Sequence, residues 1–247
     1  MKVDFGWGAE DLARVADTAD AIVIVDTLRF TSAVSVAVSR GAVILPYRWR
    51  DDTVTHHALA HDAEVGGSRE NPTTPWSLSP TDLAEIPAGT RVVLPSPNGA
   101  TLSVLAGESG ARAVLAGCLR NRTAVARALT AMAGEVRTVA VIAAGERWPD
   151  EEGEHTGPMR PAFEDLIGAG AVIDALLDVA GATSSPEARG ARDAFLGAAP
   201  TLLEDLRSCM SGVELIARGW DDDVQMCAQL DVDLDAPIFD GVAFRRN

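Results

Sequence analysis

The segment from Ala21 to Gly41 constrains the fold more than any other part of the chain. It opens with Ala-Ile-Val-Ile-Val, a short apolar run rich in β-branched residues. Such a run predicts a strand buried on both faces, as in parallel sheets. An apolar helix follows, and Gly41 is a natural residue for it to end at. A second apolar run begins at Val43. The segment therefore predicts a β-α-β unit of a layered α/β/α fold with a largely parallel sheet.

Polar residues crowd the turn between this strand and its helix. Asp26 follows the strand directly, and Thr27, Arg29, Thr31 and Ser32 come next. Ligands of open α/β sheets bind at the carboxyl ends of the strands. A helix cap with one ion pair would account for one or two of these groups. The density of polar groups favours a ligand site over that simpler alternative.

Three further strands, expected near 90–94, 113–116 and 136–143, end in turns of the same character. The residues that follow them include Asn98, Gly99, Arg120, Asn121 and Glu146. Because carboxyl ends of parallel strands meet at one edge of a sheet, we expect Asp26, Asn98, Asn121 and Glu146 to lie near one another. A turn that leads into a helix also offers free backbone amides to an anion.

Length and charge narrow the function. The chain has 247 residues and 47% hydrophobic residues, which favours one α/β domain over 1–247 with a helix-rich part from about 182. Its net charge of −15 argues against nucleic acid and anionic membranes as partners. An apolar run long enough to span a membrane and a leader peptide are both missing, so we expect a cytoplasmic protein. The sequence leaves homo-oligomerisation open.

Several other motifs favour structural interpretations. The three cysteines are far apart in sequence and are expected in the core. His57 and His61 have metal-ligand spacing, but a solvated helix face is the favoured interpretation. For the acidic run 221–223, helix capping and solvated charge are favoured over a metal site. The tail 237–244 is expected to end in an edge strand.

Two segments outside the strands carry further candidate residues. The stretch 66–80 lacks periodicity and is expected to be a long loop, in which Arg69 follows two glycines and can clamp an anion. The acidic stretch 151–161 is a second expected loop. Glu164 and Asp165 then open a long helix, where they suit the helix dipole or can bind a metal.

The chain resembles the 2-phosphosulpholactate phosphatase family in an ordered set of motifs that covers nearly its whole length: VIVDTLRFTSAV, GGSREN, WSLSP, PSPNGATL, AGCLRN, AAGE, FEDLIGAGAVI and SGVELIARGWDDDVQMCAQLD. The resemblance implies an α/β fold and a magnesium-dependent phosphatase. Its substrate would be 2-phosphosulpholactate, hydrolysed to sulpholactate on the route to coenzyme M. The positions that match the family are Asp26, Arg29, Thr31, Asn98, Gly99, Asn121, Glu164 and Asp165.

The chemistry of phosphate ester hydrolysis indicates which of these residues are catalytic and which bind metal or substrate. A phosphate monoester dianion repels its nucleophile, so hydrolysis requires charge neutralisation and a proton for the leaving alkoxide. We expect Asp26, Arg29 and Glu164 to be catalytic, and Mg²⁺ to be held by Asp26, Glu164 and Asp165. The residues expected to bind the anionic phosphate ester are Thr31, Ser32, Arg69, Asn98, Gly99, Arg120 and Asn121.

The chain departs from the family pattern at three positions. Ser68 stands where the family usually has Glu, Leu78 stands where it usually has Asn, and Pro97 removes a backbone donor from its turn. These departures keep two alternatives open. One is an anion-binding protein of the same fold without turnover, and the other is a phosphatase for another small phosphorylated acid.

Overall fold

The computed structural model describes residues 1–49, 51, 53–70, 74–150 and 157–246. The strands are β1 (Lys2–Trp7), β2 (Ala21–Val25), β3 (Val43–Tyr47), β4 (Glu64–Val65), β5 (Arg91–Pro95), β6 (Ala113–Gly117), β7 (Thr138–Ala143), β8 (Glu146–Arg147), β9 (Met159–Arg160), β10 (Thr183–Ser184), β11 (Pro237–Phe239) and β12 (Phe244–Arg246). The helices are α1 (Gly8–Val15), α2 (Phe30–Ser39), α3 (Thr53–Ala60), α4 (Pro80–Leu83), α5 (Gly99–Gly107), α6 (Arg122–Ala131), α7 (Phe163–Ala180), α8 (Pro186–Ala198), α9 (Leu202–Ser208), α10 (Met210–Ala217) and α11 (Asp221–Cys227).

A ten-stranded sheet runs through the molecule in the order β10-β1-β7-β2-β6-β11-β12-β3-β5-β4. The strand pairs on both flanks of the β11–β12 hairpin are parallel, and the hairpin pairs antiparallel with β6 and β3. The four strands predicted from apolar runs are confirmed as β2, β5, β6 and β7. The layered fold with a largely parallel sheet and a helical C-terminal region is therefore confirmed.

Strand β2 lies in the middle of the parallel flank and is buried on both faces, as predicted. Ile22 and Ile24 point to the layer that contains α1, α2 and α5, whereas Val23 and Val25 point to the layer of α6, α7 and α8. This alternation follows from the two-residue period of a strand. Helix α2 ends before Gly41, whose φ of +87° is the left-handed conformation expected there.

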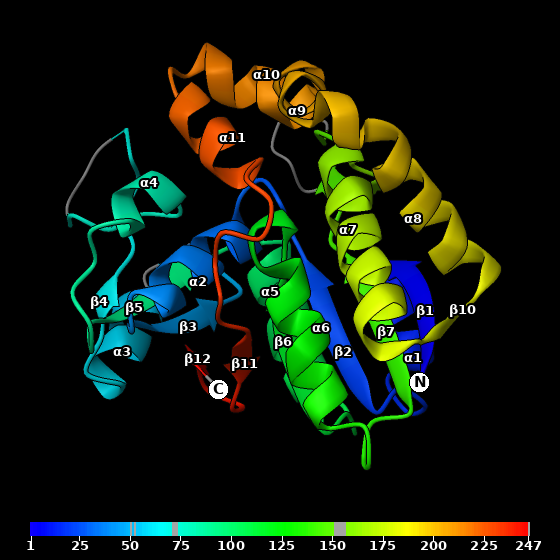
Figure 1. The fold of residues 1–247 in the computed structure, drawn as a ribbon. Helices are drawn as coiled ribbons and strands as arrows, with labels where there is room; N and C mark the ends of the chain where they lie inside the picture. Colours follow the sequence, from blue (N-terminus) through cyan, green and yellow to red (C-terminus); the bar gives the residue numbers. More distant parts are fainter. Residues whose placement is uncertain (50, 52, 71–73, 151–156, 247) are drawn as a thin grey trace.

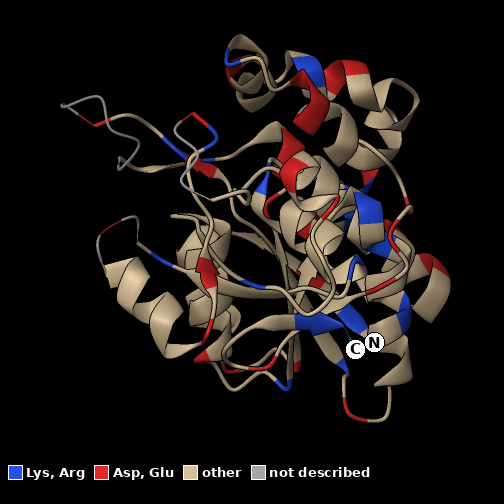
Figure 2. Cartoon of the chain, turned by 90° about the vertical axis from the view of Figure 1, so that its left-hand side faces the viewer, with Lys and Arg blue, Asp and Glu red and all other residues tan. Residues whose placement is uncertain are grey.

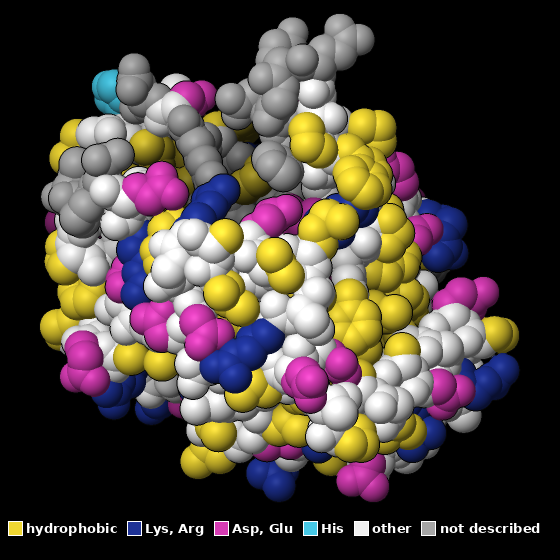
Figure 3. All heavy atoms as spheres, turned by 90° about the horizontal axis from the view of Figure 1, so that it is seen from above, with side chains coloured by type: hydrophobic (Ala, Val, Ile, Leu, Met, Phe, Trp, Pro, Cys, Tyr) yellow, Lys and Arg dark blue, Asp and Glu magenta, His cyan; other side chains and the backbone are white. Residues whose placement is uncertain are grey.

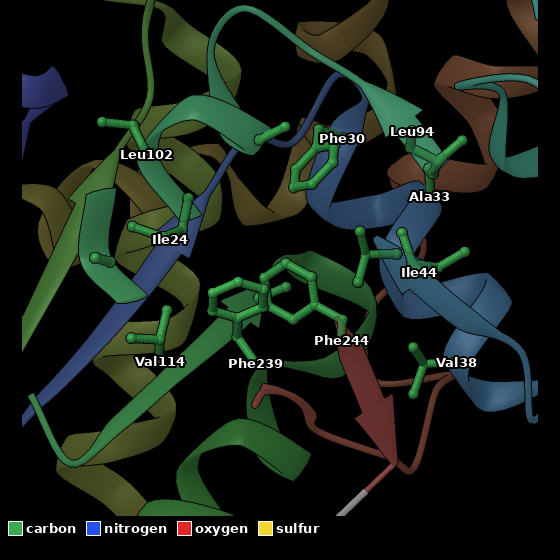
Figure 4. Close-up of a cluster of buried hydrophobic side chains, with 14 of the residues drawn as sticks. Ile24, Phe30, Ala33, Val38, Ile44, Leu94, Leu102, Val114, Phe239 and Phe244 are labelled. Atoms are coloured by element: carbon green, nitrogen blue, oxygen red, sulfur yellow. The ribbon is translucent and has the colours of Figure 1, made fainter. Parts of the chain in front are cut away.

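The C-terminal hairpin corrects one prediction. The tail was expected to supply an edge strand, but β11 and β12 fill the centre of the sheet between β6 and β3. Phe244 is completely buried and lies against Phe30 and Phe239, with ring centroids 6.3 and 5.2 Å away (Figure 4). The short apolar runs of the tail gave no sign of this position, because burial at a sheet centre depends on which strands leave a gap.

The last helices gather at one end of the molecule. Figure 1 shows α9, α10 and α11 over the end of the sheet where the chain passes from β2 into α2. Val224 of α11 and Leu206 of α9 pack with Ile167 of α7 in one apolar cluster. The C-terminal region therefore covers the carboxyl ends of the parallel strands. The extent of the chain as one domain, 1–247, stays a prediction.

Two surface observations bear on partners. None of the helices within the described residues has the length and apolar character needed to cross a membrane. On the side shown in Figure 2, basic and acidic residues are interspersed. The predicted loops 66–80 and 151–161 lie partly outside the described residues, at 71–73 and 151–156.

The position of the hairpin yields a stability prediction. We expect Phe244→Ala to lower the free energy of unfolding by about 3–5 kcal/mol, because it leaves a cavity among buried rings. Arg245→Ala, the adjacent exposed position on the same strand, should cost less than about 1 kcal/mol. Urea unfolding of both variants measures the difference. Equal small losses would mean that the tail is peripheral to the sheet.

Candidate active site

The turn after β2 is folded by its own side chains. The Thr31 hydroxyl donates to the carbonyl oxygen of Asp26 at 2.9 Å and accepts from the amide of Asp26 at 3.0 Å. The Ser32 hydroxyl donates to the carbonyl oxygen of Thr27 at 2.8 Å. Both hydroxyl residues are buried. Their predicted contact with substrate stays a prediction, and their observed bonds shape the turn that presents Asp26.

Asp26 links this turn to the turn after β5. One carboxylate oxygen accepts from the amide of Phe30 at 3.1 Å, and the other accepts from the amide of Gly99 at 2.8 Å. A Cβ at Gly99 would lie 2.6 Å from that oxygen and 2.5 Å from the Phe30 ring. Only glycine lets the backbone approach so closely. The predicted meeting of Asp26 with the 98–99 turn is confirmed.

Asp165 ties a third turn into the same place. It is buried in the first turn of α7, and its two oxygens accept from the amides of Thr27 at 2.7 Å and Gly145 at 2.9 Å. One side chain thus holds together the turns that follow β2 and β7. Glu146, next to Gly145, accepts from the Asn98 side-chain amide at 2.9 Å. The predicted gathering of Asp26, Asn98, Asn121 and Glu146 at one sheet edge is therefore confirmed for Asp26, Asn98 and Glu146, and it stays a prediction for Asn121.

The result is a cluster of four carboxyl groups, Asp26, Glu146, Glu164 and Asp165, which we call the acidic cluster. Burial raises the pKa of Asp26, and the charge of Glu164 raises it further. Burial, followed by the charges of Asp26 and Glu164, raises the pKa of Glu146 to about 8. Burial and the charges of Asp26 and Glu164 also hold the pKa of Asp165 well above its usual range. The raised pKa values show that positive charge near the acidic cluster does not balance its four carboxyl groups.

Glu164 connects the acidic cluster to the C-terminal helices. It is buried in the first turn of α7, beside the dipole that favours a carboxylate there. Near it, at the start of α10, the half-buried Cys209 thiol donates to the carbonyl oxygen of Leu206 at 3.1 Å. Burial and the charge of Glu164 raise the pKa of that thiol to about 12, so it stays protonated. Cys118 and Cys227 are buried, as predicted for core residues, whereas Cys209 belongs to the surroundings of the site.

The donor chemistry of the acidic cluster suits a hard divalent cation, because carboxylate oxygens are its preferred ligands and their mutual repulsion needs relief. Within the described residues, no three His, Cys, Asp or Glu side chains are already arranged to hold a metal ion. Mg²⁺ commonly uses one or two carboxylates and completes its shell with water and substrate phosphate. The cluster fits that mode of binding and not an all-protein cage. His57 of α3 and His61, which follows that helix, have ring centroids 4.6 Å apart and are not part of this cluster.

A cavity of about 480 Å³ lies beside the turn after β2, with Arg29, Arg69, Arg218 and Trp220 in its wall. The guanidinium carbons of Arg29, Arg218 and Arg69 lie 4.7, 5.5 and 5.9 Å from the centroid of the Trp220 ring. Arg29 also lowers the pKa of Asp26 by its charge, although burial outweighs it. Arg29 therefore lies between the acidic cluster and the cavity. Figure 3 shows this end of the molecule, where acidic, basic and apolar side chains are intermixed.

Asp223 corrects the prediction that the acidic run is capping and solvated charge. Its side chain is completely buried and accepts from Arg29 at 2.5 Å and Arg69 at 3.2 Å. The hydroxyls of Ser79 and Thr81 donate to its other oxygen at 2.5 and 2.8 Å. The helix itself begins without a side-chain cap. Four donors from three distant segments outweighed the local preference of Asp for helix ends.

The turn after β6 provides a different kind of contact. Arg120 is buried and forms a two-pronged pair with Asp233 at 2.8 and 2.9 Å. Asn121 accepts from the amide of Cys118 and donates to the carbonyl oxygen of Ala116, within its own turn. The substrate-binding roles of Arg120 and Asn121 stay predictions. Their contacts favour a structural role, in which Arg120 anchors the segment between α11 and β11.

Ser68 and Leu78, two of the positions that depart from the family pattern, both line the cavity. Arg218, Trp220 and Asp223 were not among the predicted site residues. A run of Arg, Gly, Trp and three Asp is dense in polar and aromatic groups, and that density was the available signal. Its distance in sequence from Arg29 hid the contact.

Comparison with known proteins agrees with the sequence resemblance. The family model described as 2-phosphosulpholactate phosphatase matches residues 9–241. A search of curated proteins found no match to the chain.

The raised pKa of Glu146 predicts how stability depends on pH in the absence of divalent cations. The unfolded chain ionises this carboxyl near 4.5, but the folded protein does so only near pH 8. Its contribution to stability is therefore fully present below pH 4.5 and is lost as the pH rises toward 8. We expect Glu146→Gln to be more stable than the wild type at pH 8, by on the order of 2–4 kcal/mol, and nearly equal at pH 4.5.

Urea unfolding in a chelating buffer at the two pH values measures this difference. Glu135→Gln, an exposed position after α6, is the control and should behave as the wild type. A constant difference between Glu146→Gln and wild type at both pH values would contradict the raised pKa that burial and the neighbouring carboxylates give Glu146.

Proposed function

The chain belongs to the 2-phosphosulpholactate phosphatase family, and on that premise we propose that it hydrolyses 2-phosphosulpholactate to sulpholactate and inorganic phosphate with Mg²⁺ as its cofactor. The family is one of phosphatases, so a small phosphate ester is the substrate class. The observation that carries the proposal is the pairing of a buried acidic cluster with an arginine-lined cavity. Cytoplasmic location, homo-oligomerisation and a role in forming coenzyme M stay predictions.

The charge of the substrate accounts for this pairing. A phosphate monoester with a carboxylate and a sulphonate carries several negative charges, which a carboxylate cluster alone would repel. Asp26 and Glu164 would hold Mg²⁺, with Asp165 fixing the turns around them through its bonds to Thr27 and Gly145. The cation would neutralise phosphoryl charge and orient the attacking water. Arg29, between cluster and cavity, would bind an oxygen of the same phosphoryl group.

Hydrolysis also requires proton transfer. Water attacks phosphorus, the bond to the substrate oxygen breaks, and that oxygen needs a proton as it leaves. Glu146 accepts a hydrogen bond from Asn98 at Oε2, which leaves Oε1 to carry its proton. We assign Glu146 as the proton donor to the leaving oxygen. One proton of the attacking water stays on the phosphate product, and the other replaces the proton that Glu146 has donated.

A second candidate function is supported by a specific observation. Ser68 and Leu78, two of the three departures from the family pattern, share the wall of one cavity. A hydroxyl and an apolar side chain there replace a carboxylate and an amide of the family, which would change the substrate that fits. A phosphatase for another small phosphorylated acid is therefore the alternative, and a protein that binds the anion without turnover is the further one. A panel of phosphorylated hydroxy acids, assayed for phosphate release, separates the three.

Removal of one carboxylate tests the metal. We expect phosphate release from 2-phosphosulpholactate to require Mg²⁺ and to stop after exhaustive chelation. Glu164→Gln should raise the Mg²⁺ concentration for half-maximal rate at least tenfold, because one of few charged ligands is lost. Glu187→Gln is the matched control, since Glu187 is an exposed acid in the first turn of α8. Full activity in chelator would remove the metal from the mechanism.

Arg29→Lys tests the role of the guanidinium. Lysine keeps the charge but loses the two-pronged geometry, so kcat/KM should fall by about ten- to a hundredfold. Folding should survive, because Asp223 keeps its bonds to Arg69, Ser79 and Thr81. Melting temperature and kcat/KM are measured on the same preparation.

Arg122→Lys is the control for this substitution. Arg122 pairs with Asp231 and Asp174 away from the cavity, and its variant should lose stability and keep its kinetics. A stable Arg29→Lys protein with wild-type kcat/KM would show that Arg29 only supports the fold.

A further inference from the structure

The three arginines around Trp220 differ in how many of their N–H groups are already bonded. All three guanidinium nitrogens of Arg69 already have partners within the protein. Its Nη2 donates to Asp222 at 2.9 Å and to Thr81 at 3.1 Å, its Nη1 donates to Asp223 at 3.2 Å, and its Nε lies 3.6 Å from Asp82. This arginine joins the long loop to α11 and has little left to offer a substrate.

Arg29 and Arg218 are different. Arg29 uses Nη1 for Asp223, and its Nε and Nη2 donate to none of the described residues. Among the residues that the structure describes, Arg218 has a single ion pair, to Glu70 at 3.9 Å, and both partners are more than half exposed. A pair of that length in water contributes little and is easily exchanged for a better anion. Both guanidiniums lie near the Trp220 ring and in the cavity wall.

From this difference we infer that Arg218, beside the indole of Trp220, forms a subsite for the acid group of the substrate that is not phosphorylated, while the free N–H groups of Arg29 remain for the phosphoryl group. The inference rests on the proposed phosphatase function and adds a specificity determinant to it. Its ligand is a sulphonate or a carboxylate, which share charge and acceptor oxygens. Arg69, by contrast, is a positioning residue for this wall.

The arrangement explains how one small substrate meets both parts of the site. The charge of Arg29 acts on Asp26 in the acidic cluster, and its side chain also lines the cavity. In this arrangement the phosphoryl group binds between Arg29 and the acidic cluster. The second acid group then lies on the side of Arg218. The cavity volume of about 480 Å³ accommodates a molecule of this size with water around it. The guanidinium carbons of Arg29 and Arg218 lie 4.7 and 5.5 Å from the centroid of the same Trp220 ring.

A comparison of substrates tests the subsite. Phosphate release is measured with 2-phosphosulpholactate, with 2-phospholactate, which lacks the sulphonate, and with the phosphate ester of 2-hydroxyethanesulphonate, which lacks the carboxylate. For each enzyme the ratio of kcat/KM between the full substrate and each truncated one is the readout. Arg218→Gln should reduce one of these ratios by about ten- to a hundredfold, the effect of losing one charge-assisted hydrogen bond. The ratio that collapses identifies the acid group.

Arg189→Gln is the matched control, because Arg189 is an exposed arginine on α8 outside the cavity wall and its loss changes net charge equally. Its ratios should stay within about twofold of wild type. If both kcat/KM ratios of Arg218→Gln equal those of the wild type, the subsite is overturned, whereas the proposed phosphatase function is not. If the wild type releases phosphate from none of the three compounds, the proposed function is overturned instead.

A binding measurement gives a readout besides turnover. Sulpholactate is titrated while Trp fluorescence is followed, and the signal that Trp220→Phe removes is assigned to the cavity. Arg218→Gln should weaken the apparent affinity for sulpholactate at least tenfold. Equal affinity in wild type and Arg218→Gln would contradict the subsite. Arg218 is exposed, so its variants retain the fold, and Arg218→Lys should recover part of the affinity.

Discussion

Like charge held out of water at the end of β2 is the constraint on which the rest of the site depends. Four carboxyl groups share a space in which Asp26, Glu164 and Asp165 are almost completely buried. Burying an ionised carboxylate without a compensating charge or hydrogen bond costs free energy. The raised pKa values of Asp26, Asp165 and Glu146 follow from this cost, because it disfavours their charged forms. Backbone amides of Phe30, Gly99, Thr27 and Gly145 compensate in part. These bonds also lock three turns together, so the same interactions that lessen the repulsion build the site.

On the arginine side of the site, donors outnumber carboxylates around one buried acceptor. Asp223 is fully buried yet collects two guanidiniums and two hydroxyls. It therefore fixes the wall of the cavity from a helix almost two hundred residues beyond Arg29. Removing such a partner would leave buried charge unpaired, which is more damaging than never having formed the pair. The C-terminal helices are thus part of the site and not an appendage to the sheet.

Local patterns predicted the features that depend on local physics. The apolar run 21–25 had to be buried, and polar residues after parallel strands had to converge, so the contacts of Asp26 with Gly99 and of Asn98 with Glu146 could be anticipated. Asp223 and Phe244 could not. Asp at a helix start is usually a cap, and a short apolar tail is usually peripheral. Both predictions failed because a partner distant in sequence decided the outcome.

The central claim is that the acidic cluster binds a divalent cation, and proton release on Mg²⁺ binding tests it most directly. Because Glu146 has a pKa of about 8 without metal, much of it is protonated at pH 7. A cation bound to Asp26 and Glu164 would lower that pKa toward neutrality, so that a fraction of a proton is released while part of Glu146 stays protonated as the donor. Calorimetric titration in buffers of different ionisation enthalpy counts the released protons. The account predicts net proton release at pH 7, smaller in Glu146→Gln. Mg²⁺ binding without proton release, or no binding at millimolar Mg²⁺, would contradict it.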